Sequence, residues 1–200
     1  MVMGMPGSGK GTQAERTAAT YQIPHISTGD IFRSLAQSKS PIGLEAQTYM
    51  DKGNLVPDGL VNKILWDRLG EKDTVKGFVL DGYPRTLSQA EALEVYLQSK
   101  GVPLDAALYL AVGKQELRKR LEKRLHSPSV SPDFPERGES HSSRVDDQSE
   151  VVERRLKVSE SEVEALLHFY QGLGIVSIVD GEKEPDIVFA KIQESLQFHS

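Results

Sequence analysis

Residues 4–12 read GMPGSGKGT; a short apolar run at 1–3 precedes them, and a helical stretch carrying Gln13, Ala14 and Glu15 follows. Glycines let backbone N–H groups turn inward around phosphate oxygens, and a helix N-terminus adds the positive end of its dipole. Lys10 supplies a point charge for the outer phosphates. A strand, a glycine loop and a helix in this order predict a phosphate-binding loop. Its predicted contacts are Gly7, Ser8, Gly9, Lys10, Gly11 and Thr12.

The loop departs from the general phosphate-binding pattern at one position. That pattern has Ser or Thr directly after the lysine. Here Gly11 follows Lys10 and Thr12 comes one residue later. We therefore expect either the Thr12 hydroxyl or the Gly11 backbone to replace the hydroxyl of that Ser or Thr.

Short apolar runs alternate with longer amphipathic stretches along the whole chain. The runs lie at 1–3, 25–27, 78–80, 107–112 and 175–179. Such alternation predicts an α/β fold, here a P-loop three-layer sandwich with a five-stranded parallel sheet and helices on both faces. We expect one domain over 1–200, with two excursions: a helical detour at 28–58 and a segment at 125–146 that includes a stretch rich in Ser, Pro and Glu.

Composition narrows the classes of protein that the chain can belong to. The 200 residues carry a net charge of -5, which gives no overall attraction to nucleic acid or to an anionic membrane. The absence of cysteine excludes disulfides and Cys-type zinc sites, and no apolar run approaches the roughly 20 residues that span a bilayer. We expect a cytoplasmic monomer without structural zinc, nucleic-acid partner or membrane contact.

A second group of polar residues follows the third apolar run, where 78–85 read FVLDGYPR. Asp81 stands at the carboxyl end of a predicted buried strand, the edge at which open parallel sheets bind ligands. It is suited to hold Mg²⁺ through water. Arg85 follows a tight turn and can present a bidentate fork to a phosphate. The ordinary alternative is a helix-capping Asp81 and a solvated Arg85.

Arginines are concentrated in one part of the chain, since seven of the eleven lie between Arg118 and Arg155. Arg120 and Arg124 are four residues apart and should share one helix face. Arg155 lies on the next predicted helix, which we expect to begin with Asp147 as N-cap. Solvated helix faces are the ordinary explanation of such a cluster, but a phosphate-binding loop in the same chain favours a role in phosphate binding.

Six segments, GMPGSGKGTQ, HISTGDIFR, GNLVP, LDGYPRTLSQA, SRVDD and VDG, together resemble the adenylate kinases over nearly the whole length. The resemblance implies Mg²⁺-dependent transfer between ATP and AMP to give two ADP. It assigns catalysis to Lys10, Arg85, Arg120, Arg124, Arg144 and Arg155. It adds Arg120, Arg124 and Lys183 to the ATP contacts. The assigned AMP contacts are Thr28, Arg33, Asn54, Leu55, Val56, Gly82, Arg85, Gln89, Arg144 and Arg155. Asp81 remains the residue expected to hold Mg²⁺ through water.

The resemblance also implies which acceptor is used, because pyrimidine-preferring relatives have Ala in place of Thr28 and lack the glutamine at Gln89. AMP is therefore expected over UMP or CMP. Two alternatives stay open: another nucleoside monophosphate kinase, and a weakened nucleotide-binding module with a short first strand and an interrupted lid. A GTPase or ATPase fits less well, because the chain has a complete acceptor site.

The sequence departs from the family pattern in the expected lid. Residues 126–136 intrude between the first arginine pair and SRVDD, where Asp146 and Asp147 are expected to aid lid closure. Arg137 repeats the family's Arg-Gly-Glu sequence, so either Arg124 or Arg137 fills the second lid position, and we favour Arg124. Ser143 replaces the usual glycine before Arg144. The choice between ATP and GTP as donor stays open.

Overall fold

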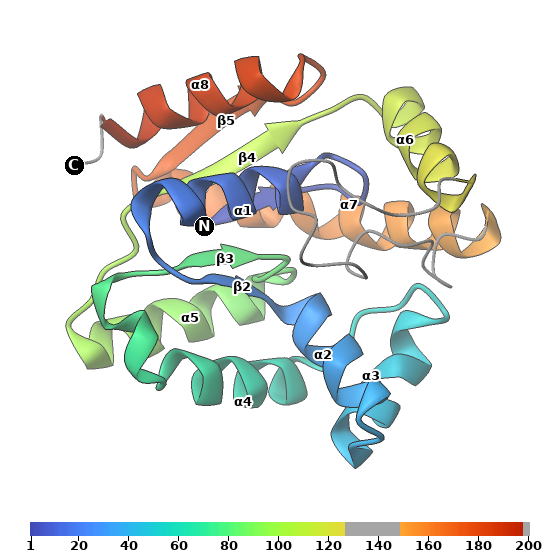
Figure 1. Cartoon of the computed structure of the whole chain (residues 1–200), viewed down its shortest axis with the longest axis horizontal. Helices are drawn as coiled ribbons and strands as arrows, with labels where there is room; N and C mark the ends of the chain where they lie inside the picture. Colours follow the sequence, from blue (N-terminus) through green and yellow to red (C-terminus); the bar gives the residue numbers. More distant parts are fainter. Residues whose placement is uncertain (127–148, 198–200) are drawn as a thin grey trace.

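A computed structural model describes residues 1–126 and 149–197, and Figure 1 shows the arrangement of its elements. The strands are β1 (Val2–Gly4), β2 (His25–Ser27), β3 (Val79–Asp81), β4 (Ala107–Ala111) and β5 (Val176–Asp180). The helices are α1 (Lys10–Tyr21), α2 (Thr28–Gln37), α3 (Pro41–Met50), α4 (Asp58–Leu69), α5 (Leu87–Lys100), α6 (Lys114–His126), α7 (Ser149–Gly172) and α8 (Pro185–Gln197), with a 3₁₀ turn at Lys72–Lys76.

The five strands form one parallel sheet in the order β2-β3-β1-β4-β5. The predicted fold class is therefore confirmed. Three of the five strands begin and end one residue later than the apolar runs that predicted them, because an apolar run marks burial whereas a strand is defined by backbone pairing. The shift places Asp81 itself in β3, at the carboxyl edge of the sheet.

Side chains alternate between the two faces of the sheet and so build two separate cores. On one face Met1, Met3 and Leu80 pack against α4, α5 and α7. On the other face Val2, Val79 and Leu108 pack against α1 and α8. Figure 1 shows α8 and α1 on one side of the strands and α4 and α5 on the opposite side. A third, smaller apolar cluster joins α6 to α7.

Strand order brings the candidate site residues to one edge. β2 and β3 lie on one side of β1 and β4 and β5 on the other, so the strand order reverses direction at β1, and ligands bind at such a switch point. The loop after β1, Asp81 at the end of β3 and Ser27 at the end of β2 all lie at the carboxyl edge. Helices α2 and α3 pack closely together and depart from this core.

Candidate nucleotide site

The glycine loop after β1 is held in its shape by unusual backbone angles and short internal contacts. Gly9 is the N-cap of α1 with φ 87°, in the left-handed region where a side chain is strained. A Cβ on Gly4 would lie 2.6 Å from Ser8 Oγ. The Ser8 N–H donates to the Met5 carbonyl at 3.1 Å, and Lys10 Nζ donates to the same carbonyl at 3.5 Å. The loop therefore stands ready at the N-terminus of α1.

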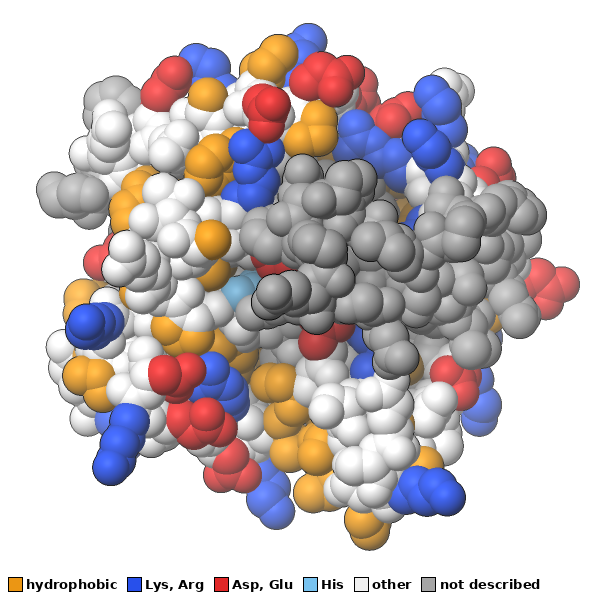
Figure 2. Space-filling model, viewed as in Figure 1, with side chains coloured by type: hydrophobic (Ala, Val, Ile, Leu, Met, Phe, Trp, Pro, Cys, Tyr) orange, Lys and Arg blue, Asp and Glu red, His pale blue; other side chains and the backbone are white. Residues whose placement is uncertain are grey.

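This loop forms one wall of a cleft with an empty volume of about 1210 Å³, open solvent at its mouth included. The cleft brings together most residues expected to contact phosphates or AMP. These are Gly7, Gly9, Lys10, Gly11, Thr12, Arg33, Asn54, Leu55, Asp81, Gly82, Arg85, Arg120, Arg124 and Arg155. Ser8 is 2% exposed and is not among the residues that line the cleft. Figure 2 shows Lys and Arg side chains gathered over α6, the helix that carries Arg120 and Arg124.

A second, smaller cavity of about 370 Å³ adjoins the cleft and shares Asn54, Leu55, Gly82 and Arg85 with it. Its other walls are mostly apolar and include Phe32, Val56 and Val61. Thr28 and Gln89 supply polar groups there. An apolar pocket with a few polar groups suits a flat heterocycle such as a nucleobase, next to phosphates held in the larger cleft.

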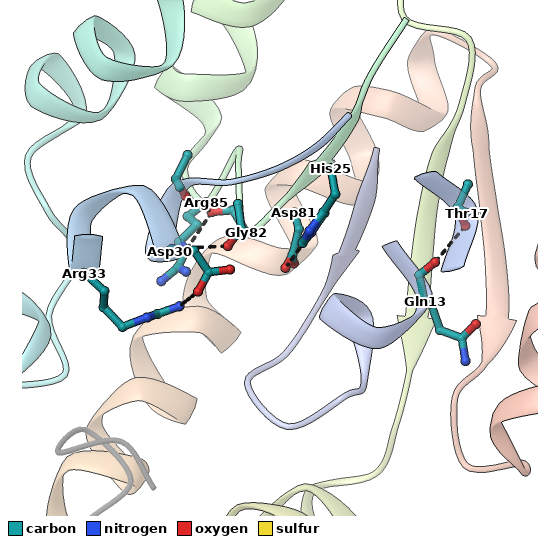
Figure 3. A network of polar contacts seen from close by, with 10 residues as sticks. Gln13, Thr17, His25, Asp30, Arg33, Asp81, Gly82 and Arg85 are labelled. Carbon is teal, nitrogen blue, oxygen red and sulfur yellow. Dashed lines mark hydrogen bonds and ion pairs between the residues drawn. The ribbon is translucent and has the colours of Figure 1, made fainter. Parts of the chain in front are cut away.

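Two predicted AMP contacts meet at the carbonyl of Gly82. Thr28 Oγ1 donates to this oxygen at 3.1 Å and Arg85 Nε donates to it at 2.8 Å. Figure 3 shows Arg85 beside Gly82, and Arg33 paired with Asp30 on α2. Gly82 has φ 72°, and a Cβ there would lie 3.0 Å from Arg85 Nη2. The turn after β3 thus fixes the direction of the Arg85 side chain.

Asp81 is buried and lies next to His25, whose Nε2 is 3.4 Å from Asp81 Oδ2 without hydrogen-bond geometry (Figure 3). Burial raises the pKa of Asp81, whereas the neighbouring His25, Lys10 and Arg85 together lower it by a larger amount. The net pKa is therefore below its ordinary value. The carboxylate is therefore ionised at neutral pH. Its Oδ1 has no hydrogen-bond partner within the described residues.

That buried oxygen is the observation against which a magnesium site can be tested. Mg²⁺ keeps several waters and is commonly held by one or two carboxylates together with substrate phosphates. An ionised Asp81 with one unpartnered oxygen in the cleft fits this chemistry. Among residues 1–126 and 149–197 there is no group of three or more His, Cys, Asp or Glu that could hold a metal on protein ligands alone.

Helices α6 and α7 contribute three arginines to the lining of the cleft, Arg120, Arg124 and Arg155. Arg120 is anchored twice, with Nε donating to Glu116 at 2.8 Å and Nη1 to the Gly181 carbonyl at 2.9 Å. Arg124 lies one turn further along α6 and lines the same cleft, as the four-residue spacing predicted. Arg155 lies on α7 and is close to Gly53, since a Cβ added to Gly53 would lie 3.0 Å from Arg155 Cγ.

Lys183 is placed apart from this cluster. Its ammonium lies 3.6 Å from the Asp180 carboxylate, and its side chain is largely exposed. It is not among the residues that line the cleft. The carbonyl of Gly181, two residues earlier, is the acceptor for Arg120.

Part of the expected site lies outside the described residues. This holds for Arg144, Arg137, Ser143, Asp146 and Asp147, and for nearly all of the expected lid at 125–146 with its insertion. The expected N-cap of the following helix is among them. Within the described part, α7 begins at Ser149 with Glu150 in its first turn.

Several cleft residues were not singled out from the sequence. Ser27 ends β2, Gly29 and Met50 belong to the excursion, and Gly53 is the first residue of the segment GNLVP. Ser159 also lines the cleft and lies four residues after Arg155, so a helical projection from that arginine could have found it. Asp30 and Arg33 form an ion pair, and they are three residues apart within HISTGDIFR. That spacing of opposite charges on a helix could have predicted the pair.

Comparison with known proteins supplies an independent line of argument. The family model described as Adenylate kinase matches residues 2–175. The chain is 41% identical to a Bacillus subtilis (strain 168) protein named Adenylate kinase, over 98% of this chain and 96% of that protein. It is 42% identical to the protein of the same name from Clostridium tetani (strain Massachusetts / E88), over 98% of this chain and 97% of that protein.

Proposed function

This chain belongs to the adenylate kinase family and is a nucleoside monophosphate kinase, and we propose how its residues divide the transfer of a phosphoryl group from ATP to AMP. The observation that carries the proposal is a single cleft lined by the glycine loop, Asp81, Arg85 and the arginines of α6 and α7. Cations contributed by several separate elements suit two anionic ligands held end to end, with reacting phosphates between them.

The loop residues and Lys10 bind the donor. Backbone N–H groups at residues 7–12 and the N-terminus of α1 face the β- and γ-phosphates, while Arg120 and Arg124 cover the triphosphate from α6. Lys183 contributes its backbone near the donor base. Mg²⁺, when bound with the nucleotide, neutralises charge on the phosphates, and Asp81 would hold it through water.

The acceptor occupies the smaller cavity and the adjoining part of the cleft. Thr28, Val56 and Gln89 surround the base, with the Asn54–Leu55 backbone beside it. Arg33 and Arg85 bind the acceptor phosphate, and Arg155 with Arg144 bridges to the migrating group. The attacking oxygen of AMP is already anionic, so the reaction needs no general base. Positioning and charge stabilisation by the arginines provide the catalysis.

Closure of the excursion at 28–58 and of the lid at 125–146 excludes water, which would otherwise accept the phosphoryl group. No helix in the described ranges combines the length and apolar character needed to cross a membrane. We propose that the enzyme acts as a monomer in the cytoplasm.

A coupled assay of ADP formation from ATP, AMP and Mg²⁺ tests the function, with UMP, CMP and GTP as alternative acceptors and donor. We expect AMP to be preferred over UMP and CMP, on the strength of Thr28 and Gln89. If UMP or CMP supports the same activity as AMP, the assignment of AMP as the acceptor is wrong. If no ADP forms above background, the chain is a nucleotide-binding module and not a kinase.

A further inference from the structure

Asp58 connects the end of the excursion to the acceptor loop. It occupies the first position of α4, but its carboxylate does not cap that helix, whose N-cap Pro57 has no side-chain cap. Instead Asp58 Oδ2 accepts from Thr86 Oγ1 at 2.9 Å, and Asp58 Oδ1 accepts from Gln89 Nε2 at 2.7 Å. Both partners belong to the start of α5, which lies beside α4 (Figure 1).

Gln89 is 2% exposed and is held at both ends of its side-chain amide. Its Nε2 donates to Asp58, and its Oε1 accepts from the Arg85 backbone N–H at 2.7 Å. A carboxylate can only accept a hydrogen bond and a backbone N–H can only donate one. If the amide were reversed, Gln89 Oε1 would face the Asp58 carboxylate, acceptor against acceptor, and Nε2 would face the Arg85 N–H, donor against donor. Asp58 and the Arg85 N–H therefore fix the orientation of the amide.

The fixed amide keeps one N–H and one oxygen lone pair for a further partner, since a glutamine amide has two of each. A donor beside an acceptor is complementary to adenine, which offers an acceptor ring nitrogen and the N6 amino donor on one edge. Hypoxanthine has nearly the same shape but carries a carbonyl in place of that amino group. A site whose polar groups match one base rejects the other, because the wrong base leaves buried groups unpaired.

We propose that Asp58 is a positioning residue for acceptor selection, which sets the orientation of the Gln89 amide so that the site reads adenine. The inference rests on the proposed function, in which Gln89 faces the acceptor base, and it names the group that makes this reading specific. Asp58 acts through Gln89 and does not itself line the smaller cavity.

A purely structural role is the competing explanation, because Thr86 is the N-cap of α5 and accepts from the Gln89 N–H at 3.1 Å. On that explanation Asp58 only steadies a helix cap. Loss of a cap lowers the melting temperature, but it does not alter the choice between two bases. Stability and base preference therefore separate the two roles.

The test is steady-state kinetics of the full chain with AMP and with IMP at saturating ATP. For Asp58→Ala we expect the AMP KM to rise about tenfold, the preference for AMP over IMP to fall about tenfold, and the ATP KM to change less than about twofold. Asp58→Asn should restore most of the preference, because its side-chain oxygen can still accept from Gln89. If Asp58→Ala does not fold, Asp58→Ser, too short to reach Gln89, carries the same expectation.

Two comparison variants complete the design. Asp67→Asn, an exposed carboxylate on the same helix, should match the unchanged protein in both measurements. Thr86→Val should lower the melting temperature yet keep the base preference, because Asp58 still reaches Gln89. An Asp58→Ala protein that melts early but keeps its AMP preference within about twofold would overturn the proposal.

A separate variant tests the premise that Gln89 faces the acceptor base. Gln89→Leu should lose the preference for AMP over IMP. If it keeps that preference, Gln89 does not read the base and the role proposed for Asp58 falls with it, although the kinase activity stands. Absence of AMP-dependent ADP formation by the unchanged protein would contradict the proposed function instead.

Discussion

At the scale of single residues, the site depends on cations that are fixed in place before any nucleotide arrives. Lys10 reaches back across its loop to the Met5 carbonyl, and Arg85 is directed by the Gly82 carbonyl. Arg120 is held between Glu116 and Gly181. Such anchoring reduces the conformational entropy that a long side chain loses when it binds a phosphate.

Lys10→Ala and Arg85→Ala should each lower turnover by about a hundredfold or more, because each removes a positive charge that we propose acts on the transferred group. The melting temperature should change little, since neither side chain packs in a core cluster. The measurement is the coupled assay beside thermal unfolding. Lys63→Ala, on the exposed side of α4, is the matched control, and near-normal rates in either site variant would show that the site is assigned incorrectly.

At the scale of elements, the excursion depends on close packing between α2 and α3. A Cβ on Gly43 would lie 2.2 Å from the Leu35 carbonyl carbon and 2.3 Å from the Ala36 nitrogen, both backbone atoms of α2. Backbone cannot move aside as a flexible side chain can. The two helices therefore approach so closely that position 43 has no room for a side chain.

We predict that Gly43→Ala lowers the free energy of unfolding by about 1–3 kcal/mol, as overpacking of a tight interface does. Gly59→Ala is the matched control, because a Cβ there would meet nothing within 4 Å. Its helical position should make the change neutral or stabilising by up to about 1 kcal/mol. Urea unfolding followed by circular dichroism measures both, and equal stability of the two variants would contradict the packing argument.

Helices α6 and α7 are joined by a bidentate ion pair in addition to their apolar cluster. Arg118 Nε and Nη2 donate to the two Glu153 oxygens at 2.6 and 2.9 Å. Hydrogen bonding to Arg118 lowers the pKa of Glu153 below its ordinary value of 4.5. The pair connects the helices that precede and follow residues 127–148.

Because the folded pKa of Glu153 is depressed, its stabilising effect is complete above pH 4.5 and is lost as pH falls through the lower folded value. Glu153→Gln should therefore melt below the unchanged protein at neutral pH, and the difference should shrink toward acid pH. The effect should be small and reduced by salt, since both side chains are about half exposed. Thermal melts across pH, with Glu164→Gln as control, measure it; a gap independent of pH would exclude the pair as its cause.

At the scale of the whole molecule, the cleft is assembled from parts that are far apart in the chain. The glycine loop, the turn after β3, the excursion and helices α6 and α7 each contribute cations or backbone to one space. A ligand that spans the cleft therefore contacts all of these parts at once. Binding to the folded state alone stabilises it by mass action.

Two adenosines joined by five phosphates should raise the melting temperature more than ATP or AMP alone at equal concentration. At a hundred times its dissociation constant such a ligand stabilises the fold by about 2.7 kcal/mol. Differential scanning fluorimetry with Mg²⁺ measures the shift. The Lys10→Ala protein should show a much smaller shift, and no shift in the unchanged protein would contradict the proposal of two nucleotides in one cleft.

The sequence alone was sufficient for the parallel sheet, the glycine loop between β1 and α1, the shared face of Arg120 and Arg124, and the family. These features are local, because a strand period, a glycine loop and a helix face are each defined within a few consecutive residues. Family membership adds the reaction, since the motifs occur in order along nearly the whole chain.

Only the tertiary structure decided which distant groups meet. The pairing of Asp58 with Gln89, the contact of His25 with Asp81, and the missing space at Gly43 have no signature in the local sequence. The first two depend on crossovers that bring separate strand and helix ends to one edge of the sheet, and the third depends on how closely α2 and α3 pack. A hydrogen bond acts over about 3 Å in space whatever the separation along the chain, so the fold, and not the spacing of residues, selects its partners.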